Sequence, residues 1–291
     1  MKRNIIFLSI VFIMIYLAGC KQIDNENQNS QVVIHLTAKS LSGTLSSTAS
    51  SVENSISKVI LFGVDDQDKV VQTFAPIQKP SLKDTALYVS QKVSMLYAIA
   101  NPSESLAKAT PSTGLDIMNL IDDFTTAPEA PFLMGGKGEI KNFSVTIELI
   151  RAVAKIEVKG KNDFQITSVT VENTSDRGYV FKQKSLSLPA FTQSVKYAAV
   201  ISATPTLYVA ESLAQNPASF VVKGTLEGKQ ASYTFTLLSE GKKIDLVRNT
   251  HYQISITPIT HDDCIITVKI PTWDDGEKLD DQIIPDNAFN P

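Results

Sequence analysis

Cysteine is scarce in this chain of 291 residues. Two cysteines are present, Cys20 and Cys264. Small secreted domains without an adequate apolar core are usually held together by several disulfides, and two cysteines cannot supply such a framework. The fold must therefore rest on hydrophobic packing. A chain of this length can bury two cores of ordinary size.

Strong charge of either sign is also absent. Lys and Arg number 27 and Asp and Glu number 30, which gives a formal net charge of −3 at pH 7. The basic residues form no block along the sequence. Nucleic-acid binding requires a clustered basic surface, because contacts to the phosphate backbone supply much of the affinity. We therefore expect no nucleic-acid partner.

The residue patterns of common active sites are missing. His35, His251 and His261 lie far apart, and there is neither a Gly-x-Ser-x-Gly elbow nor a phosphate-binding glycine loop. Residues 261–263 (His-Asp-Asp) are consecutive, and adjacent residues seldom converge on one metal ion. Residues 65–68 are acidic but lack the glycine and the distal glutamate of an EF-hand. The sequence predicts no enzyme, no metal site and no cofactor.

A single tryptophan, Trp273, lies near the C-terminus. Sugar-binding sites use aromatic side chains as platforms, and the Tyr and Phe residues fall mostly in expected strands, where core packing explains them. A glycan-binding surface lipoprotein therefore stands as an alternative function, with Trp273 as the residue to test.

A secretory signal is present at the N-terminus. Met1–Asn4 is basic, and Ile5–Leu17 is an apolar run shorter than the ~20 residues of a membrane span. The run ends in Leu-Ala-Gly-Cys, which resembles the lipobox of bacterial lipoproteins. That resemblance implies that residues 1–19 are removed by cleavage between Gly19 and Cys20, and that Cys20 is lipidated. The alternative is a plain signal peptide or an uncleaved anchor.

A polar tether and then a strand follow. Residues 20–30 are rich in Asn, Gln and acidic side chains, which is typical of a flexible tether. Period-2 alternation then predicts a first strand with four apolar residues on one face: Val32, Ile34, Leu36 and Ala38. Lys39–Asn54 is dominated by Ser and Thr and is expected to be a long exposed loop.

The remainder of the first half is expected to be mostly strand with one helix. Strands are predicted at Ile56–Val64, Lys69–Phe74, Ala86–Val89 and Ser94–Ala100. Leu115–Phe124 has helical spacing, with Leu115, Met118 and either Leu120 or Ile121 facing the core. Pro128 and Pro131 follow as helix breakers.

Two abutting period-2 runs in Ser144–Val158 form the centre of the chain. Alternation before Arg151 and alternation after it are not separated by a turn signal. This pattern predicts the last strand of one domain and the first strand of the next, with Arg151 in a structural role at the join.

The second half is expected to be all strand and turn. Predicted strands are Ala152–Val158, Gln165–Glu172, Gly178–Phe181, Thr206–Ala210, Ser219–Leu226, Ala231–Leu238, Tyr252–Pro258 and Ile265–Ile270. Gly228-Lys229 is a hairpin signal. Short, evenly spaced strands with Gly, Asn and Pro between them favour β-sandwiches over a parallel α/β sheet.

Several stretches, in order along the chain, resemble the FimA/Mfa-like fimbrillins of Bacteroidales type V pili. They are LAGC, SKVILFGVDD, YAIANP, PFLMGG, LIRAVAKIEV, FQITSVTVENTSDRGYVF, LYVAES, VRNTHYQISIT and ITVKIPTW. The resemblance implies a mostly β fold with two transthyretin-like β-sandwich domains in tandem, at 31–148 and 149–291, and a short helix in the first. It also implies a structural pilus subunit at the outer membrane.

Assembly by donor-strand exchange is the further implication of this resemblance. Partners would be other fimbrial subunits, the outer membrane through lipid on Cys20, and a surface receptor. The removable strand would be the first one. The donor would be either the segment with Ile266, Val268, Ile270 and Trp273, which we prefer, or the acidic tail Asp274–Pro291.

One departure from the family pattern concerns processing. Cleavage after an arginine in the loop that follows the first strand is usual in the family, and residues 39–54 contain no arginine. Lys39 is the only basic residue there. Either another protease cuts this loop, or the first strand is retained and the protein is a lipid-held anchor or accessory subunit.

Overall fold

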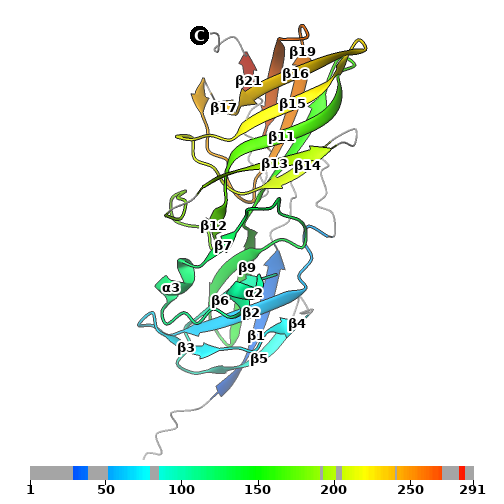
Figure 1. Cartoon of the computed structure of the whole chain (residues 1–291). Helices are drawn as coiled ribbons and strands as arrows, with labels where there is room; N and C mark the ends of the chain where they lie inside the picture. Colours follow the sequence, from blue (N-terminus) through cyan, green and yellow to red (C-terminus); the bar gives the residue numbers. More distant parts are fainter. Residues whose placement is uncertain are drawn as a thin grey trace, which may run out of the picture.

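The computed structural model describes residues 29–38, 52–78, 85–190, 193–200, 205–239, 241–270 and 282–285. They form two β-rich lobes, one above the other in Figure 1. The expected mostly β fold of two tandem sandwiches is confirmed. Within these residues no helix has the length and the apolar composition that a membrane crossing requires.

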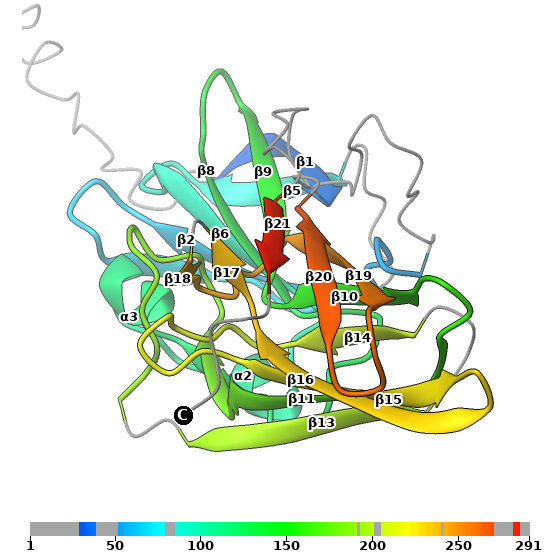
Figure 2. The same cartoon turned by 90° about the horizontal axis from the view of Figure 1, so that it is seen from above.

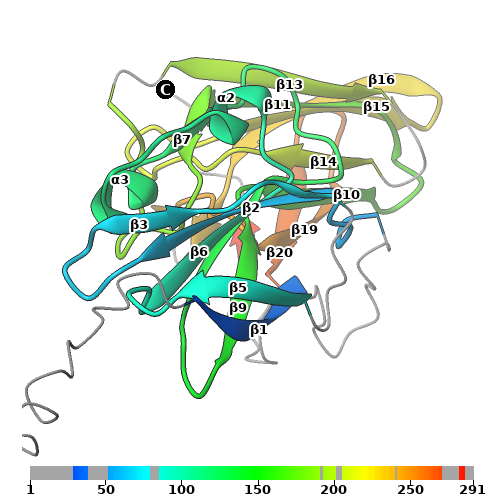
Figure 3. The same cartoon turned by 90° about the horizontal axis from the view of Figure 1, so that it is seen from below.

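One eight-stranded sheet forms the N-terminal lobe, in the order β3-β2-β6-β8-β9-β1-β5, with β4 paired to β2. Its strands are β1 (Asn29–Ala38), β2 (Lys58–Val64), β3 (Val70–Thr73), β4 (Ile77–Gln78), β5 (Thr85–Ser90), β6 (Met95–Ala100), β8 (Met134–Glu139) and β9 (Ser144–Arg151). The sheet curls so that β1, β5 and β9 face β2 and β6 (Figure 3). Ile34, Leu61 and Ile147 are among the buried side chains between them. A sandwich core thus comes from a single sheet.

Two short helices cover the opposite face of β2 and β6. They are α2 (Glu104–Ala107) and α3 (Gly114–Met118). Leu106 and Ile117 point into a second core, which also contains Phe62 from β2. The first of these helices was not predicted from the sequence.

The prediction of a helix through Phe124 is wrong. The helix ends at Met118, and the following residues form β7 (Ile121–Asp123), which pairs with β12 (Arg177–Tyr179). A strand partner from the second half of the chain thus outcompetes local helical spacing.

The predicted buried face of this helix is wrong in part. Met118 and Leu120 pack against the second core, as predicted. Leu115 is instead 63% exposed, and Ile117, which was not predicted to face inward, is fully buried. The Thr113 hydroxyl accepts a hydrogen bond from the backbone N–H of Asp116, and the Asp116 carboxylate accepts one from the N–H of Thr113. This capping box fixes where the helix begins, and hence which side chains face inward.

The chain passes from one lobe to the other at the predicted stretch. β9 ends at Arg151 in the first sheet, and β10 (Ala154–Gly160) belongs to a different, five-stranded sheet. Ala152 and Val153 between them are buried in the second core, together with Val180. The lobes therefore share apolar packing.

Two larger sheets form the C-terminal lobe, in the orders β14-β10-β19-β20-β21 and β13-β11-β15-β16, and β17 and β18 pair as a separate two-stranded sheet. The remaining strands are β11 (Gln165–Ser175), β13 (Ser194–Val200), β14 (Thr206–Val209), β15 (Ser219–Leu226), β16 (Lys229–Thr236), β17 (Leu238–Ser239), β18 (Lys242–Lys243), β19 (His251–Pro258), β20 (Cys264–Lys269) and β21 (Gln282–Pro285). Figure 2 shows the two sheets as layers. Ile156, Phe220 and Tyr252 lie in the core between them.

The predicted hairpin at Gly228 is present. Leu226 pairs with Lys229 across a two-residue turn, in which Glu227 and Gly228 have φ values of 52° and 77°. Positive φ at both central positions is the type I′ geometry that favours glycine. β8 and β13 were not predicted as strands. The strand predicted at Gly178–Phe181 is instead the shorter β12.

Candidate functional site

The first strand, β1, lies inside the N-terminal sheet. Residues Asn29 to Ile34 pair antiparallel with β5. Residues Val33 to Ala38 pair parallel with β9. The two neighbours therefore hold the two halves of β1, and together they define the groove that β1 occupies.

The predicted inward face of β1 is buried at the three positions whose side chains the structure describes, and the Ala38 side chain lies outside that description. Val32, Ile34 and Leu36 are 2%, 1% and 2% exposed. Burying side chains of this size stabilises a fold by about 1.5–3 kcal/mol each, so these three contribute roughly 5–9 kcal/mol. A contribution of that size prevents easy loss of β1, unless a strand with the same apolar pattern replaces it.

A hollow lies beside the N-terminal half of β1, where β9 has not yet begun. It has a volume of about 400 Å³. Val32, Val89 and Val93 form its apolar lining, while Asn142 and Phe143 come from the turn between β8 and β9. This turn exposes the Phe143 ring, at 65%. The groove is thus open toward solvent at this end.

Arg151 forms the polar centre of the join between the lobes. Its side chain is fully buried. Nε donates to the backbone oxygen of Glu53 at 3.1 Å, Nη1 donates to Oδ1 of Asn249 at 3.1 Å, and Nη2 donates to Oδ1 of Asn54. These partners come from the segment before β2 and the segment before β19. The expected structural role of Arg151 at the join fits this placement.

The side chain of Glu53 extends the same cluster. It is 3% exposed. One of its oxygens lies 2.8 Å from Nζ of Lys155 and accepts a hydrogen bond from the hydroxyl of Tyr208. Burial and this bond to Glu53 raise the pKa of the Tyr208 hydroxyl, so Tyr208 stays protonated and keeps donating. The segment that contains Glu53, directly after residues 39–51, is therefore bound to the second lobe through Lys155 and Tyr208.

His251 lies next to this cluster and is held neutral. Burial lowers the pKa of its imidazole to about 4, and the positive charge of Lys155 acts in the same direction. Its Nε2 lies 3.3 Å from Oε2 of Glu157. The His251 imidazole is thus neutral and buried where the two lobes meet, which fits a structural role.

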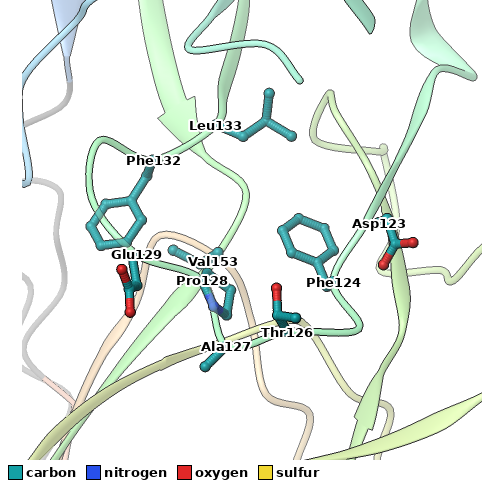
Figure 4. A pocket seen from close by; sticks show the side chains of 9 residues that line it. All are labelled: Asp123, Phe124, Thr126, Ala127, Pro128, Glu129, Phe132, Leu133 and Val153. Atoms are coloured by element: carbon teal, nitrogen blue, oxygen red, sulfur yellow. The ribbon is translucent and has the colours of Figure 1, made fainter. Parts of the chain in front are cut away.

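A second hollow opens at the level of the join (Figure 4). It has a volume of about 380 Å³ and lies in the loop between β7 and β8. Phe124, Phe132 and Val153 supply apolar lining, with Asp123 and Glu129 among its polar residues. The described part of the chain holds no group of three or more His, Cys, Asp or Glu side chains arranged for a metal ion.

The C-terminal end of the chain forms the edge of a sheet. β20 lies between β19 and β21, and β21 pairs with β20 from Gln282 opposite Val268 to Pro285 opposite Ile265. Ile266 and Val268 are 2% and 3% exposed and belong to the core of the C-terminal lobe. The predicted donor residues on β20 are thus interior, whereas β21 is peripheral.

The structure brings some predicted site residues together and leaves others undescribed. Gly19, Cys20, Lys39 and Trp273 lie outside the described residues. The three inward residues of β1 share one groove, while Ile266, Val268 and Ile270 lie in the other lobe.

Sequence reasoning missed Glu53 and Gln72. Glu53 falls in a segment read as loop, although an acidic residue in a Ser-rich run is a weak signal of an ion pair. Gln72 sits on β3, and its side chain bonds to the backbone of β5. No sequence pattern identifies such a contact, because β3 and β5 lie at opposite ends of the strand order.

The same fold is found in solved structures of proteins from Bacteroides and Porphyromonas. A candidate cell adhesion protein of Bacteroides eggerthii has a TM-score of 0.62 at 13% identity, over 85% of this chain and 97% of that one. The tip fimbrial protein Mfa3 of Porphyromonas gingivalis, with a C-terminal truncation, has a TM-score of 0.60 at 15% identity, over 84% and 100%. A candidate cell adhesion protein of Bacteroides uniformis has a TM-score of 0.55 at 14% identity, over 84% and 98%.

The sequence itself supplies the family. The model of the fimbrillin-A associated anchor proteins Mfa1 and Mfa2 matches residues 124–275, just over half of the chain, and the chain belongs to this family. It is a fimbrial protein of the cell surface. No curated protein sequence gives a match.

Proposed function

We propose that this fimbrial protein is a structural subunit exported as a lipoprotein and assembled by donor-strand exchange, with β1 as the outgoing strand. The observation that carries the proposal is the position of β1 between β5 and β9, with its apolar face buried. Loss of such a strand leaves two unpaired strand edges and an apolar groove, which a strand from another subunit can satisfy.

The connection after β1 suits this role. Residues 39–51 join β1 to the rest of the chain, and Glu53 directly beyond them is buried against Lys155. A cut before Val52 would separate β1 without disturbing the cluster at the join. We therefore place the processing site within residues 39–51, where Lys39 is the only basic residue.

The proposed donor is the tail that includes β21. A donor must leave its own chain without opening that chain's core. Withdrawal of β20 would uncover Ile266 and Val268, whereas β21 pairs at the sheet edge with β20 alone among the described residues. Ile283 and Ile284 in β21 give the tail adjacent apolar residues for a groove. The structure thus favours the tail over the β20 segment preferred from the sequence.

The remaining elements of the proposal follow from export. The lipid on Cys20 would hold the precursor at the outer membrane, and the partners would be other fimbrial subunits and a surface receptor. The domains would divide near residues 148 and 149, close to the end of β9 at Arg151. The proposed role is structural and adhesive rather than enzymatic. A glycan-binding role for Trp273 would be tested by comparing Trp273→Ala with the unchanged chain on a glycan array.

The N-terminal residue of the protein purified from the cell surface tests the proposal. A polymerising subunit should begin within residues 39–51 and should appear in high-molecular-weight fibres. Uncleaved protein, carrying lipid on Cys20 and found wholly outside fibres, would contradict exchange of β1. The control is the same measurement on cells whose chain carries Cys20→Ala, in which lipid-dependent export should fail.

An anchor that keeps β1 and its lipid is the second candidate. Residues 39–54 contain no arginine, and the matching family is described as anchor proteins. Such a protein would keep its own groove filled and could contribute only its tail to a neighbour. A blocked Cys20 in protein that co-purifies with the fibre base would support this candidate.

A further inference from the structure

Of the two strands that flank β1, β5 depends more on β1 for its hydrogen bonds than β9 does. It lies at the end of the sheet order, and β1 is its hydrogen-bonded strand neighbour among the described residues. Six residue pairs, from Asn29 opposite Ser90 to Ile34 opposite Thr85, join the two strands. When β1 leaves, β5 loses this entire ladder.

Gln72 of β3 bonds to the outer edge of β5. Its Nε2 donates to the backbone oxygen of Tyr88 at 3.1 Å, and its Oε1 accepts from the backbone N–H of Ser90 at 2.8 Å. A residue in a parallel strand makes the same pair of bonds to the residues before and after the one opposite to it. The side-chain amide therefore acts as a single residue of a parallel strand placed opposite Val89.

The surroundings of Gln72 bring it close to β5. Gln72 pairs with Gly63 of β2. A Cβ atom on Gly63 would lie 2.7 Å from a methyl carbon of Val93 and 3.4 Å from Cβ of Gln72. The absence of a side chain at Gly63 thus lets Val93, and with it the turn that follows β5, pack close to β2 at the position where Gln72 of β3 pairs.

We propose that Gln72 is a positioning residue that holds β5 in place while the groove is empty, so that an incoming donor strand finds both walls. The proposal rests on the proposed strand exchange. After β1 leaves, β5 keeps its bonds to the Gln72 amide and its turn to β6, in which the N–H of Val93 donates to the oxygen of Ser90 at 2.9 Å. The turn restrains only the C-terminal end of β5. The side-chain amide of Gln72 also restrains Tyr88, through its bond to the Tyr88 backbone oxygen.

The experiment uses the full chain after folding. A recognition sequence for a site-specific protease is placed within residues 39–51, and cutting leaves β1 bound without a covalent link. A fluorescent peptide with the sequence of Asn29–Ala38 then reports release and refilling of the groove. The variants are Gln72→Leu, which has no amide, and Gln72→Glu, which can accept from Ser90 but repels the carbonyl of Tyr88. Gln78→Leu on β4 is the control, because Gln78 is an exposed glutamine on a neighbouring strand.

Gln72→Leu should raise the hydrogen-exchange rate of the Ser90 amide in the uncut chain about tenfold, since two hydrogen bonds of modest net strength are lost. In the cut chain it should slow capture of the peptide by at least about tenfold, because β5 must be reordered first. For Gln72→Glu, the Ser90 exchange rate and the capture rate should lie between those of Gln72→Leu and those of the unchanged chain. Both rates of Gln78→Leu should equal those of the unchanged chain. A merely stabilising role would lower the melting temperature without slowing capture.

Two results would overturn the inference. One is an unchanged Ser90 exchange rate in uncut Gln72→Leu. The other is capture of the peptide by cut Gln72→Leu at the rate of the unchanged chain. Failure of the unchanged cut chain to exchange β1 at all would instead contradict the proposed function, and Ser90 exchange in the uncut chain would still decide the role of Gln72.

Discussion

Replacement of Arg151 by methionine tests whether the buried cluster at the join holds the two lobes together. Methionine has a comparable length and no hydrogen-bond donors. The substitution removes the donors to the Glu53 oxygen and to the side-chain oxygens of Asn249 and Asn54. Lys155 and Tyr208 remain next to the Glu53 carboxylate.

The expected loss can be estimated from these contacts. Each buried acceptor that loses its donor costs about 1–3 kcal/mol, and breaking a buried ionic cluster typically costs about 3–5 kcal/mol. Removal of Arg151 also ends the desolvation penalty of its own charge, which offsets part of that cost. We therefore expect the free energy of unfolding to fall by about 3 kcal/mol.

Urea unfolding followed by circular dichroism measures this change, with the slope of the transition reporting whether the lobes still unfold together. Arg177→Met is the matched control, because the Arg177 side chain is 52% exposed and lies 4.0 Å from Asp176. That control should change the free energy of unfolding by less than about 0.5 kcal/mol. A loss below about 1 kcal/mol in Arg151→Met would refute the reasoning.

Three further predictions concern pH, packing and assembly. The folded pKa of His251, about 4, lies below its unfolded value of about 6.5, so the unfolded chain binds the extra proton. Stability should fall as pH decreases from 6.5 to 4, and His251→Gln should flatten that part of the pH profile measured by urea unfolding; an unchanged slope would contradict it. Gly136→Ala should destabilise the fold by about 3 kcal/mol, since the new Cβ would lie 2.2 Å from the backbone oxygen of Glu148; the same urea assay checks it, and a neutral result would disprove this close approach. Deletion of residues 271–291 should leave a folded monomer and abolish fibres in size-exclusion chromatography, and persistent fibres would exclude the tail as donor.

Local pattern predicted the strands that carry strong alternation. Val32, Ile34 and Leu36 are buried as the period-2 rule requires, and the Gly228 hairpin has the positive φ values that its residues favour. β8 escaped prediction because its Met-Gly-Gly-Lys-Gly-Glu sequence has poor strand propensity. Gly136 and Gly138 have no side chain, which allows their backbone to lie close to that of β9. This contact is evident only in the folded sheet.

The predicted end of the helix that contains Leu115 is wrong for a related reason. Helical spacing continues past Met118, but residues 121–123 gain hydrogen bonds from β12, which lies more than 50 positions along the chain. Nonlocal pairing of this kind overrides a weak local preference.

The sequence by itself determined the β class, the stretch where the lobes meet and the apolar face of β1, because each depends on composition or on spacing between near neighbours. Only the tertiary structure decided that β1 is shared between β5 and β9, that β20 is interior while β21 is at an edge, and that Glu53 and Gln72 fasten distant strands. The physical reason is that hydrogen-bond partners and burial depend on which strands meet in the curled sheet, and the residues that meet there lie far apart in sequence.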